Sequence, residues 1–263
     1  MVPKMTSHDD KLQAMARQIA NANERNARLN AADFSGNLTL DDAERVQRTL
    51  FSRPGLKIGS WKLGASTHAS RAALSMDDCF VGAIDASRTI AAPATIGSGC
   101  LRAHLVECEV AVKISIGAWL AHPDDDAAPF IESVHPAFEL PETRFGTIGE
   151  AGTAALVADY GAAGYAILGP GTDFAKFDAE GYDANVRLFV NGELQDTGEM
   201  SALVMEPLAL LNSQKHRFSQ HKNVKEWGDY ILLGSLTPPQ RLSRQDIVRA
   251  EFSRLGAIEL HIQ

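Results

Sequence analysis

The stretch LRAHLVECEVAVKIS, residues 101–115, decides the fold because its side chains alternate with a period of two. The apolar positions from 106 to 114 fall on one face of an extended chain, while Glu107, Glu109 and Lys113 fall on the other. Such alternation is typical of a strand whose apolar face is buried. We therefore predict a strand here, with two carboxylates one pleat apart on its polar face.

The two glutamates of this strand have two interpretations. Their Cβ atoms would stand about 6.6 Å apart on a strand that rises about 3.3 Å per residue. Two flexible carboxylates can close that gap onto one hard cation such as Mg²⁺. Alternatively, polar residues alternating with apolar ones are simply the solvated face of a sheet. The strand alone does not decide between a metal site and a solvated face.

Size and charge set limits on the function. The chain has 263 residues, 45% of them hydrophobic, so it can bury a substantial core as one large domain or two small ones. Its formal charge of −8, without a cluster of Lys and Arg, argues against a nucleic-acid surface. An anionic substrate would need a local cation, which a bound metal ion would supply.

The cysteines and the apolar segments indicate a cellular location. Cys79, Cys100 and Cys108 form no Cys-x-x-Cys pair, which fits free thiols in a reducing cytosol. The polar N-terminus does not have the pattern of a signal peptide, and no apolar run reaches the 18 or more residues of a membrane span. We expect a soluble, cytoplasmic protein that binds neither membrane nor nucleic acid.

The N-terminal part of the chain predicts two helices. Residues 9–30 carry a narrow apolar stripe, with Ser7 or Asp9 as the N-cap. Residues 38–51 form the second helix, with Thr39 as its N-cap and an acidic residue three positions later in the manner of a capping box.

Short apolar segments separated by Gly and Pro dominate the chain after residue 55. We expect strands at 56–66, 80–84, 101–115, 134–140 and 229–236, a hairpin at 185–196 and two strands after residue 246. A small-residue helix and a strand at 149–168, a loop at 171–183 and a helix at 200–214 complete the pattern. Strands do not alternate strictly with helices, which favours the α+β class. The simplest layout is one compact unit with a helical cap at 1–55 and a β-rich domain at 56–263.

Two further residues are candidates for chemistry. Lys62 lies between Trp61 and Leu63. Instead of taking part in chemistry, its side chain could extend along these apolar groups and place its ammonium in water. Glu139 lies in an apolar setting, where a carboxylate requires a partner or a metal ion. An ion pair with Arg144 is the alternative to metal binding.

Taken in order, the motifs of the chain resemble those of a known family. They are Trp61-Lys-Leu-Gly64, Glu107-x-Glu-x-Ala111, Pro136-Ala-x-Glu139 followed by Glu142 and Arg144, and Gly228-Asp-x-Ile-Leu-x-Gly-Ser-Leu-Thr237. This order resembles the 2-keto-4-pentenoate hydratase family of the fumarylacetoacetate hydrolase superfamily. That family includes 2-oxohepta-3-ene-1,7-dioate hydratase and 4-oxalocrotonate decarboxylase, and the resemblance extends from residue 38 to residue 256.

The resemblance implies a fold and a metal centre. The fold would be the α+β arrangement of the superfamily, a mixed β-sandwich roll with an N-terminal helical cap. Glu107, Glu109 and Glu139 would bind Mg²⁺ or Mn²⁺ and leave positions for water and substrate. Three carboxylates without thiolate or imidazole suit such a hard cation better than zinc.

The resemblance also implies roles for other side chains. Lys62 and Asp78 would be catalytic, with Lys62 transferring a proton or binding a carboxylate. A small 2-oxo or 2-hydroxy acid would be the substrate, and a homo-oligomer is expected, with a complex with a pathway enzyme as a further alternative. The implied substrate-binding residues are Ser66, Arg144, Ser235 and Thr237.

The reaction expected from the resemblance is the addition of water to a 2-hydroxy-alkadienoate in the catabolism of aromatic compounds. Decarboxylation of a 4-oxalocrotonate-type diacid is the alternative among enzymes, with Arg144 or Arg71 as the partner of the extra carboxylate. The chain departs from the family pattern at 158–163, where alanines replace small hydroxyl residues, and at 205–207, where Met-Glu-Pro replaces Gly-His-Pro. A third alternative is therefore a degenerate member that binds metal and keto acid or serves as a partner subunit.

Overall fold

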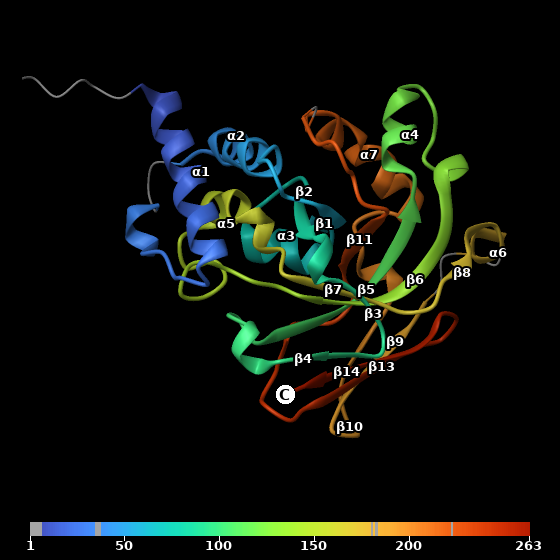
Figure 1. Ribbon diagram of the computed structural model, residues 1–263. Coiled ribbons are helices and arrows are strands. Elements are labelled where there is room, and N and C mark those ends of the chain that lie inside the picture. The colour runs from blue at the N-terminus through green and yellow to red at the C-terminus, as the bar shows by residue number, and fades with distance from the viewer. Residues whose placement is uncertain (1–6, 35–37, 180, 182–183, 222) are drawn as a thin grey trace, which may run out of the picture.

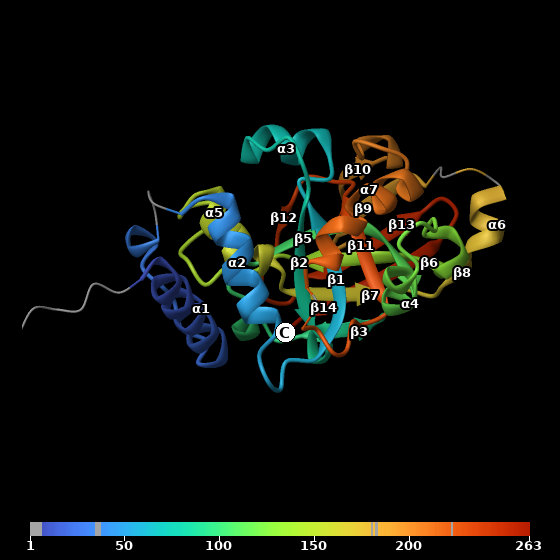
Figure 2. The same ribbon diagram turned by 90° about the horizontal axis from the view of Figure 1, so that it is seen from above.

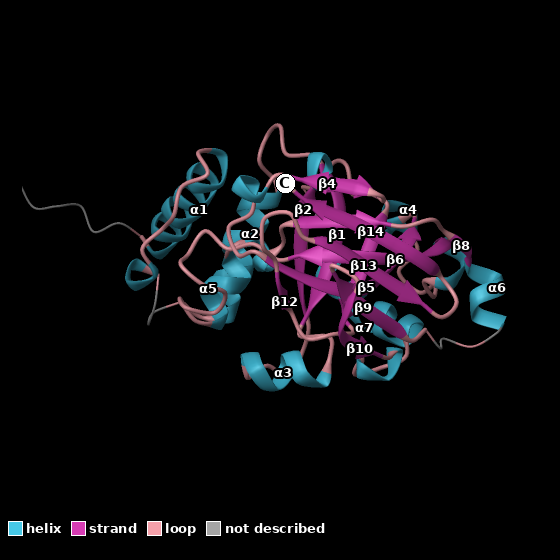
Figure 3. Cartoon of the chain, turned by 90° about the horizontal axis from the view of Figure 1, so that it is seen from below, coloured by secondary structure: helices cyan, strands magenta, loops and turns pink. Residues whose placement is uncertain are grey.

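The computed structural model describes residues 7–34, 38–179, 181, 184–221 and 223–263 (Figure 1). Two helices, α1 (His8–Glu24) and α2 (Leu40–Phe51), pack against each other at its N-terminal end. Both begin with a capping box: the one at Thr39 confirms the prediction, and the one at Ser7 decides between the two predicted N-caps. Helix α5 (Thr153–Ala158) packs against α2, so that helices cover one end of the molecule (Figures 1 and 3).

The larger of the two sheets carries the predicted Glu-x-Glu strand near its centre. Its order is β2-β1-β11-β5-β6-β7-β3, with β12 also paired to β5 and β8 to β6. The strands are β1 (Ile58–Gly64), β2 (Phe80–Asp85), β3 (Thr89–Ala91), β5 (Leu105–Ile114), β6 (Ile131–Leu140), β7 (Tyr165–Leu168), β8 (Thr172–Asp173), β11 (Tyr230–Ser235) and β12 (Gln240–Arg241). This sheet is curled, and its strands are both parallel and antiparallel.

A smaller sheet lies below the larger one in the view of Figure 1. Its order is β10-β9-β13-β14-β4. The strands are β4 (Ala94–Ile96), β9 (Val186–Val190), β10 (Glu193–Gly198), β13 (Ile247–Phe252) and β14 (Gly256–Ile262). Strands β9 and β10 form the predicted hairpin with Asn191 and Gly192 at its turn, both with positive φ.

Short helices connect the strands and lie around the larger sheet. Figure 2 shows α3 at the top of the view, apart from the sheet, with α7 and α4 toward the right. These helices are α3 (His68–Leu74), α4 (Ile116–Ala121), α6 (Phe174–Ala179) and α7 (Pro207–Ser219). Single 3-10 turns are η1 (Ala31–Asp33), η2 (Ala86–Arg88), η3 (Ser98–Cys100), η4 (Ala128–Phe130), η5 (Tyr160–Ala162) and η6 (Met200–Ala202).

The fold is the α+β arrangement expected from the sequence, with a curled mixed sheet and N-terminal helices. Val106, Cys108 and Val110 of β5 are all buried, as their alternation predicts. Every helix in the described part of the chain is too short or too polar to cross a bilayer. The boundary predicted between the helical cap and the β-rich domain, at residue 55, stays a prediction.

Several local predictions were wrong in detail. The first helix ends at Glu24 rather than near residue 30, and the expected helix at 200–214 is a 3-10 turn followed by α7. Helix α7 begins at Pro207, because proline is favoured in the first turn and would interrupt a helix interior. The loop expected at 171–183 contains β8 and α6, and its residues 180, 182 and 183 lie outside the described ones.

A buried ion pair joins the loop after β6 to η5 near the N-terminal helices. The Arg144 guanidinium donates from Nε to Oδ1 of Asp159 at 2.5 Å, and both residues are almost fully buried. The backbone N–H of Arg144 and the hydroxyl of Thr143 donate to the second oxygen, Oδ2, of the same carboxylate. Arg144 Nη1 also donates to Asn23 Oδ1 on α1, at 3.2 Å.

The substitution Asp159→Asn should lower the free energy of unfolding by about 3–5 kcal/mol, because it leaves the Arg144 guanidinium buried without a counter-charge. Urea denaturation of the purified variant measures this loss. The matched control is Glu251→Gln, which removes the charge of a partly exposed partner of Arg187 and Arg249 and should shift the midpoint little. Equal shifts for the two variants would contradict the assignment.

Candidate metal centre

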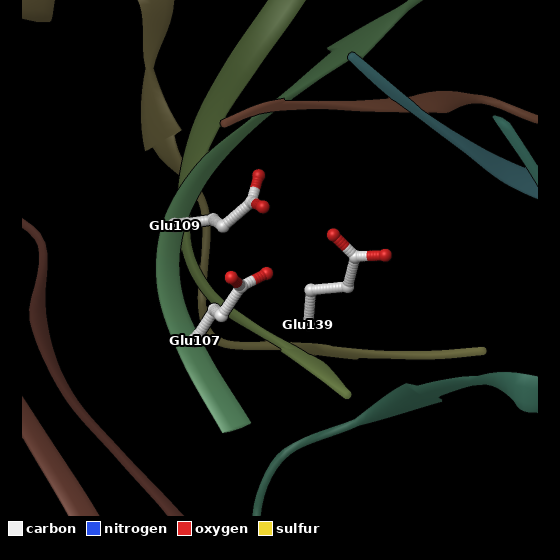
Figure 4. Close-up of side chains that lie close together, drawn as sticks. All are labelled: Glu107, Glu109 and Glu139. Atoms are coloured by element: carbon white, nitrogen blue, oxygen red, sulfur yellow. The ribbon is translucent and has the colours of Figure 1, made fainter. Parts of the chain in front are cut away.

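Three carboxylates meet at the centre of the larger sheet. Glu107 and Glu109 come from β5, and Glu139 comes from β6, directly opposite Glu107 in the antiparallel register. One carboxylate oxygen from each of the three lies within 4.8 Å of the others. Figure 4 shows the three side chains extending from neighbouring strands into one shared space. Two adjacent strands therefore supply a compact set of oxygen ligands.

Burial makes this cluster electrostatically unfavourable without a cation. Glu109 and Glu139 are each only 1% exposed. Burial, together with the neighbouring Glu139, raises the pKa of Glu107 to about 8. The pKa of Glu109 is raised well above its usual range by burial and by the other two carboxylates. The glutamates are thus not the solvated sheet face that the sequence left open as an alternative.

Lys62 is the cation closest to the cluster among the residues that line its cavity. It lies on β1, buried, with its Nζ 3.6 Å from Oε1 of Glu139 and 5.4 Å from the centre of the Phe80 ring. This lysine therefore does not extend to water. Arg144 binds Asp159 instead, so the alternative of a Glu139–Arg144 ion pair is wrong.

The polar atoms around the carboxylates fit a divalent cation. One ammonium faces three acids, and Glu139 Oε1 is buried without a hydrogen-bond partner in the described structure. Glu109 Oε2 accepts one hydrogen bond, from the backbone N–H of Gly234 at 2.7 Å. Oxygen donors alone, with unused lone pairs in a buried place, suit Mg²⁺ or Mn²⁺.

Gly234 explains how this backbone N–H reaches the cluster. Its φ of +126° lies in a region that favours glycine, at an irregularity in the pairing of β11 with β5. A Cβ at this position would lie 1.9 Å from Oγ of Ser66. Only glycine therefore permits the close approach of β11 to Glu109 and Ser66.

A cavity of about 150 Å³ opens beside the carboxylates. We call its polar side the sheet wall: Lys62, Glu107, Glu109, Glu139 and Ser235. We call the apolar side chains that the helices and the loop before α5 contribute the helix wall: Leu74 of α3, Ile148, Leu156 of α5 and Ala162 of η5. The cavity thus combines a cluster of charged groups with a group of apolar side chains.

The serine hydroxyls of the cavity donate to the backbone. Ser66 Oγ donates to the carbonyl of Leu63 at 3.0 Å, and Ser235 Oγ donates to that of Thr237 at 2.6 Å. Ser70 Oγ lies within the capping box of α3 and donates to the carbonyl of Thr67. In this arrangement each hydroxyl offers lone pairs to the cavity rather than a proton.

The structure brings some of the predicted site residues together and places others elsewhere. Lys62, Ser66 and Ser235 line the cavity with the three glutamates. The other three lie outside the cavity lining. Asp78 accepts from Arg217 at 2.6 Å, Arg144 binds Asp159, and Thr237 Oγ1 accepts from the buried N–H of Cys108.

The helix wall was missed in the sequence because its residues lie on segments with weak periodicity. Helix α3 has seven residues, none of them fully buried, so no apolar stripe marks it. The one available signal was its capping box at Thr67 and Ser70. Ile148 lies in a loop, where pattern analysis gives no orientation.

The comparisons with known proteins agree with this geometry. The fold and the carboxylate cluster define the class of α+β proteins with an acidic metal site on a curled sheet. Residues 58–263 match the family model described as fumarylacetoacetate (FAA) hydrolase C-terminal. The chain belongs to this family. No curated protein matches it significantly in sequence.

Solved structures share the fold at low identity. The 4-oxalocrotonate decarboxylase from Pseudomonas putida G7, complexed with magnesium and adipate, is similar over 99% of this chain and 100% of its own, with a TM-score of 0.79 and 20% identity. Fumarylpyruvate hydrolase from Pseudomonas aeruginosa, in complex with Mn²⁺ and pyruvate, gives a TM-score of 0.53 at 13% identity over 77% and 88% of the two chains. A 5-carboxymethyl-2-hydroxymuconate delta-isomerase from Mycobacterium smegmatis gives 0.51 at 18% identity over 79% and 77%.

Removal of one carboxylate tests the metal centre. We expect Glu139→Gln to weaken Mn²⁺ binding by at least about a hundredfold, because a ligand should contribute no less than the groups that orient ligands. Isothermal titration calorimetry measures the affinity. Glu132→Gln is the control, since Glu132 lies on the same strand but is exposed and paired with Lys113. Unchanged affinity in the Glu139 variant would refute the three-carboxylate site.

Metal binding should also depend on pH. Because the pKa of Glu107 is about 8, this carboxyl holds a proton below pH 8 that the metal must displace. Mn²⁺ affinity should therefore rise with pH, by roughly tenfold per unit between pH 6 and 7.5 for each proton released. Titrations in buffers of different ionisation enthalpy count these protons. An affinity independent of pH would show that the cluster is already ionised.

Proposed function

We propose that this protein is a divalent-metal-dependent decarboxylase of a 2-oxo-3-enedioate, a diacid of the 4-oxalocrotonate type. The observation that carries the proposal is the cluster of Glu107, Glu109 and Glu139, with Lys62, at a cavity whose other wall is apolar. The likeness to 4-oxalocrotonate decarboxylase over the whole chain, N-terminal helices included, supports decarboxylation over hydration. The adipate bound to that enzyme is a six-carbon diacid.

The three glutamates would hold Mg²⁺ or Mn²⁺. When bound, such a cation acts as a Lewis acid toward negative charge that develops on the C2 oxygen of a 2-oxo acid. It would also offset the C1 carboxylate, which a protein of charge −8 otherwise repels.

Lys62 has the position to act directly on the substrate. Its ammonium lies at the sheet wall, 3.6 Å from Glu139, and is buried against Phe80. From there it can donate a hydrogen bond to the C1 carboxylate or the C2 oxygen, or deliver the proton that the enolate requires. Ser66 and Ser235 donate their hydroxyl protons to backbone carbonyls and so keep lone pairs that can accept a hydrogen bond from a ligand.

Hydration of a 2-hydroxy-alkadienoate, the reaction first expected from the sequence, is the second candidate. The observation that favours it is the set of hydroxyls at Ser66, Ser70 and Ser235, which can accept hydrogen bonds from a bound water. Against it stands the helix wall, where Ala162 offers no group to position water at the far end of a diene. A homo-oligomer remains a prediction for either reaction.

The substitution Lys62→Met tests this assignment. We expect kcat/KM for 2-oxohex-3-enedioate to fall by at least about a hundredfold, the usual contribution of a general acid or base. The assay is loss of the substrate absorbance with Mg²⁺, with Mn²⁺ and with chelator, while released CO₂ is quantified. Lys57→Met, an exposed lysine just before the same strand, should leave the rate unchanged.

Three outcomes distinguish the candidates. Release of CO₂ that requires metal supports decarboxylation. Formation of 4-hydroxy-2-oxopentanoate from 2-hydroxypenta-2,4-dienoate, without CO₂ from the diacid, would replace decarboxylation with hydration. Metal binding without either reaction would indicate the degenerate binding protein.

A further inference from the structure

The helix wall has no counter-charge for a second carboxylate. Leu74, Ile148, Leu156 and Ala162 form it, and Lys62 is the single cationic side chain among the described residues that line the cavity. Lys62 lies on the sheet wall, beside Glu139. A substrate whose C1 and C2 oxygens meet the sheet wall, and whose chain extends to the helix wall, therefore places that chain against hydrocarbon.

The two arginines that the sequence suggested for this carboxylate are engaged elsewhere. Arg71 Nε donates to the carbonyl of Ala65 at 3.0 Å, and its Nη2 faces the Cys79 sulfur at 3.7 Å. Arg144 is 2% exposed and bound to Asp159. Neither arginine lines the cavity.

The hydroxyl groups do not compensate for the missing cation. Ser66, just before α3, and Ser70, in its first turn, also line the cavity, and both donate their protons to backbone carbonyls. A carboxylate is an acceptor and gains nothing from hydroxyls that offer only lone pairs. The site thus binds one anionic end of a diacid and leaves the other unpaired.

We infer that the helix wall receives the departing carboxylate of the substrate and that Leu74, Ile148 and Leu156 determine specificity by holding it without a partner. The inference rests on the proposed decarboxylation and adds the part of the site in which the bond breaks. An unpaired carboxylate in an apolar place is disfavoured, whereas neutral CO₂ is not. Loss of CO₂ removes the unfavourable charge, so the wall promotes the forward reaction.

The bond changes are balanced. In 2-oxohex-3-enedioate the C5–C6 bond breaks, and its electron pair forms a C4–C5 double bond. The C3–C4 pair shifts to C2–C3, and the C2 carbonyl pair moves onto oxygen. One proton taken up there gives 2-hydroxypenta-2,4-dienoate and CO₂. No oxidant or reductant is required.

Ligand affinities test the helix wall without turnover. With the Mg²⁺-saturated enzyme, calorimetry would compare 2-oxohexanoate, whose tail is neutral, with 2-oxoadipate, which has the same carbon chain and a second carboxylate. Both ligands lack the double bond of the substrate. We expect 2-oxohexanoate to bind at least about tenfold more tightly, because its tail meets the helix wall without charge. Equal or tighter binding of 2-oxoadipate would overturn the inference, because such binding requires a cationic partner for the second carboxylate.

Leu74→Arg supplies the missing partner. The variant should bind 2-oxoadipate at least about tenfold more tightly than the wild type does. It should also decarboxylate 2-oxohex-3-enedioate more slowly than the wild type. Leu74→Gln, a neutral polar control of similar size, should change this affinity less than about threefold. Arg71→Leu should likewise leave the affinity for 2-oxoadipate within about threefold. Ile148→Arg is the second cationic variant if Leu74→Arg does not fold.

Pyruvate separates damage to the metal centre from changes at the wall. It carries the 2-oxo acid group alone, so its affinity should stay within about threefold in every folded variant. A cationic variant that binds pyruvate normally but gains no affinity for 2-oxoadipate would overturn the inference. Failure of the wild type to release CO₂ from 2-oxohex-3-enedioate would refute the proposed function, whereas the ligand comparison would still report on the wall.

Discussion

The repulsion among three clustered carboxylates, two of them buried and the third partly buried, is the interaction on which the rest of this structure depends. One oxygen each of Glu107, Glu109 and Glu139 lies within 4.8 Å of the others, and Lys62 carries the one ammonium among the described residues that line the cavity. Proteins tolerate buried charges only when these are paired, protonated or bound to metal. The raised pKa of Glu107 and the Glu139 oxygen without a hydrogen-bond partner both accompany this excess of negative charge. A divalent cation bound by the three carboxylates would offset the negative charge and contact this Glu139 oxygen.

The sheet maintains this unfavourable cluster through its register. Glu107 faces Glu139 across β5 and β6, and Glu109 receives the N–H of Gly234 from β11 on the other side of β5. A slip of one residue in either pairing would turn the carboxylates to the apolar face, so the buried side chains of β5 fix the site as well as the core. The bulge at Gly234 is the one irregularity that the site requires, because it brings a backbone donor to a carboxylate.

The sequence predicted the parts of the site that depend on local pattern. The period of two at Glu107 and Glu109 defined a strand and its two faces, and the structure confirms both. The partnership with Glu139 is a long-range strand pairing, which periodicity does not encode, and it came only from the order of motifs. Roles assigned to Asp78 and Arg144 came from the resemblance, but each has its own ion pair outside the cavity. Helix α3 was missed because a short exposed helix has no amphipathic stripe.

The buried Arg144–Asp159 pair also links stability to the shape of the helix wall. The backbone carbonyl of Asp159 accepts from the N–H of Ala162 at 3.0 Å, and the carbonyl of Ala162 accepts from the N–H of Glu142 at 2.8 Å. These bonds hold Ala162 at a φ of +57°, a conformation that costs energy for alanine and persists only when its surroundings fix it. The ion pair thus fixes a strained segment whose methyl group lines the cavity. A substitution that breaks this ion pair should therefore change both the stability of the fold and the shape of the helix wall.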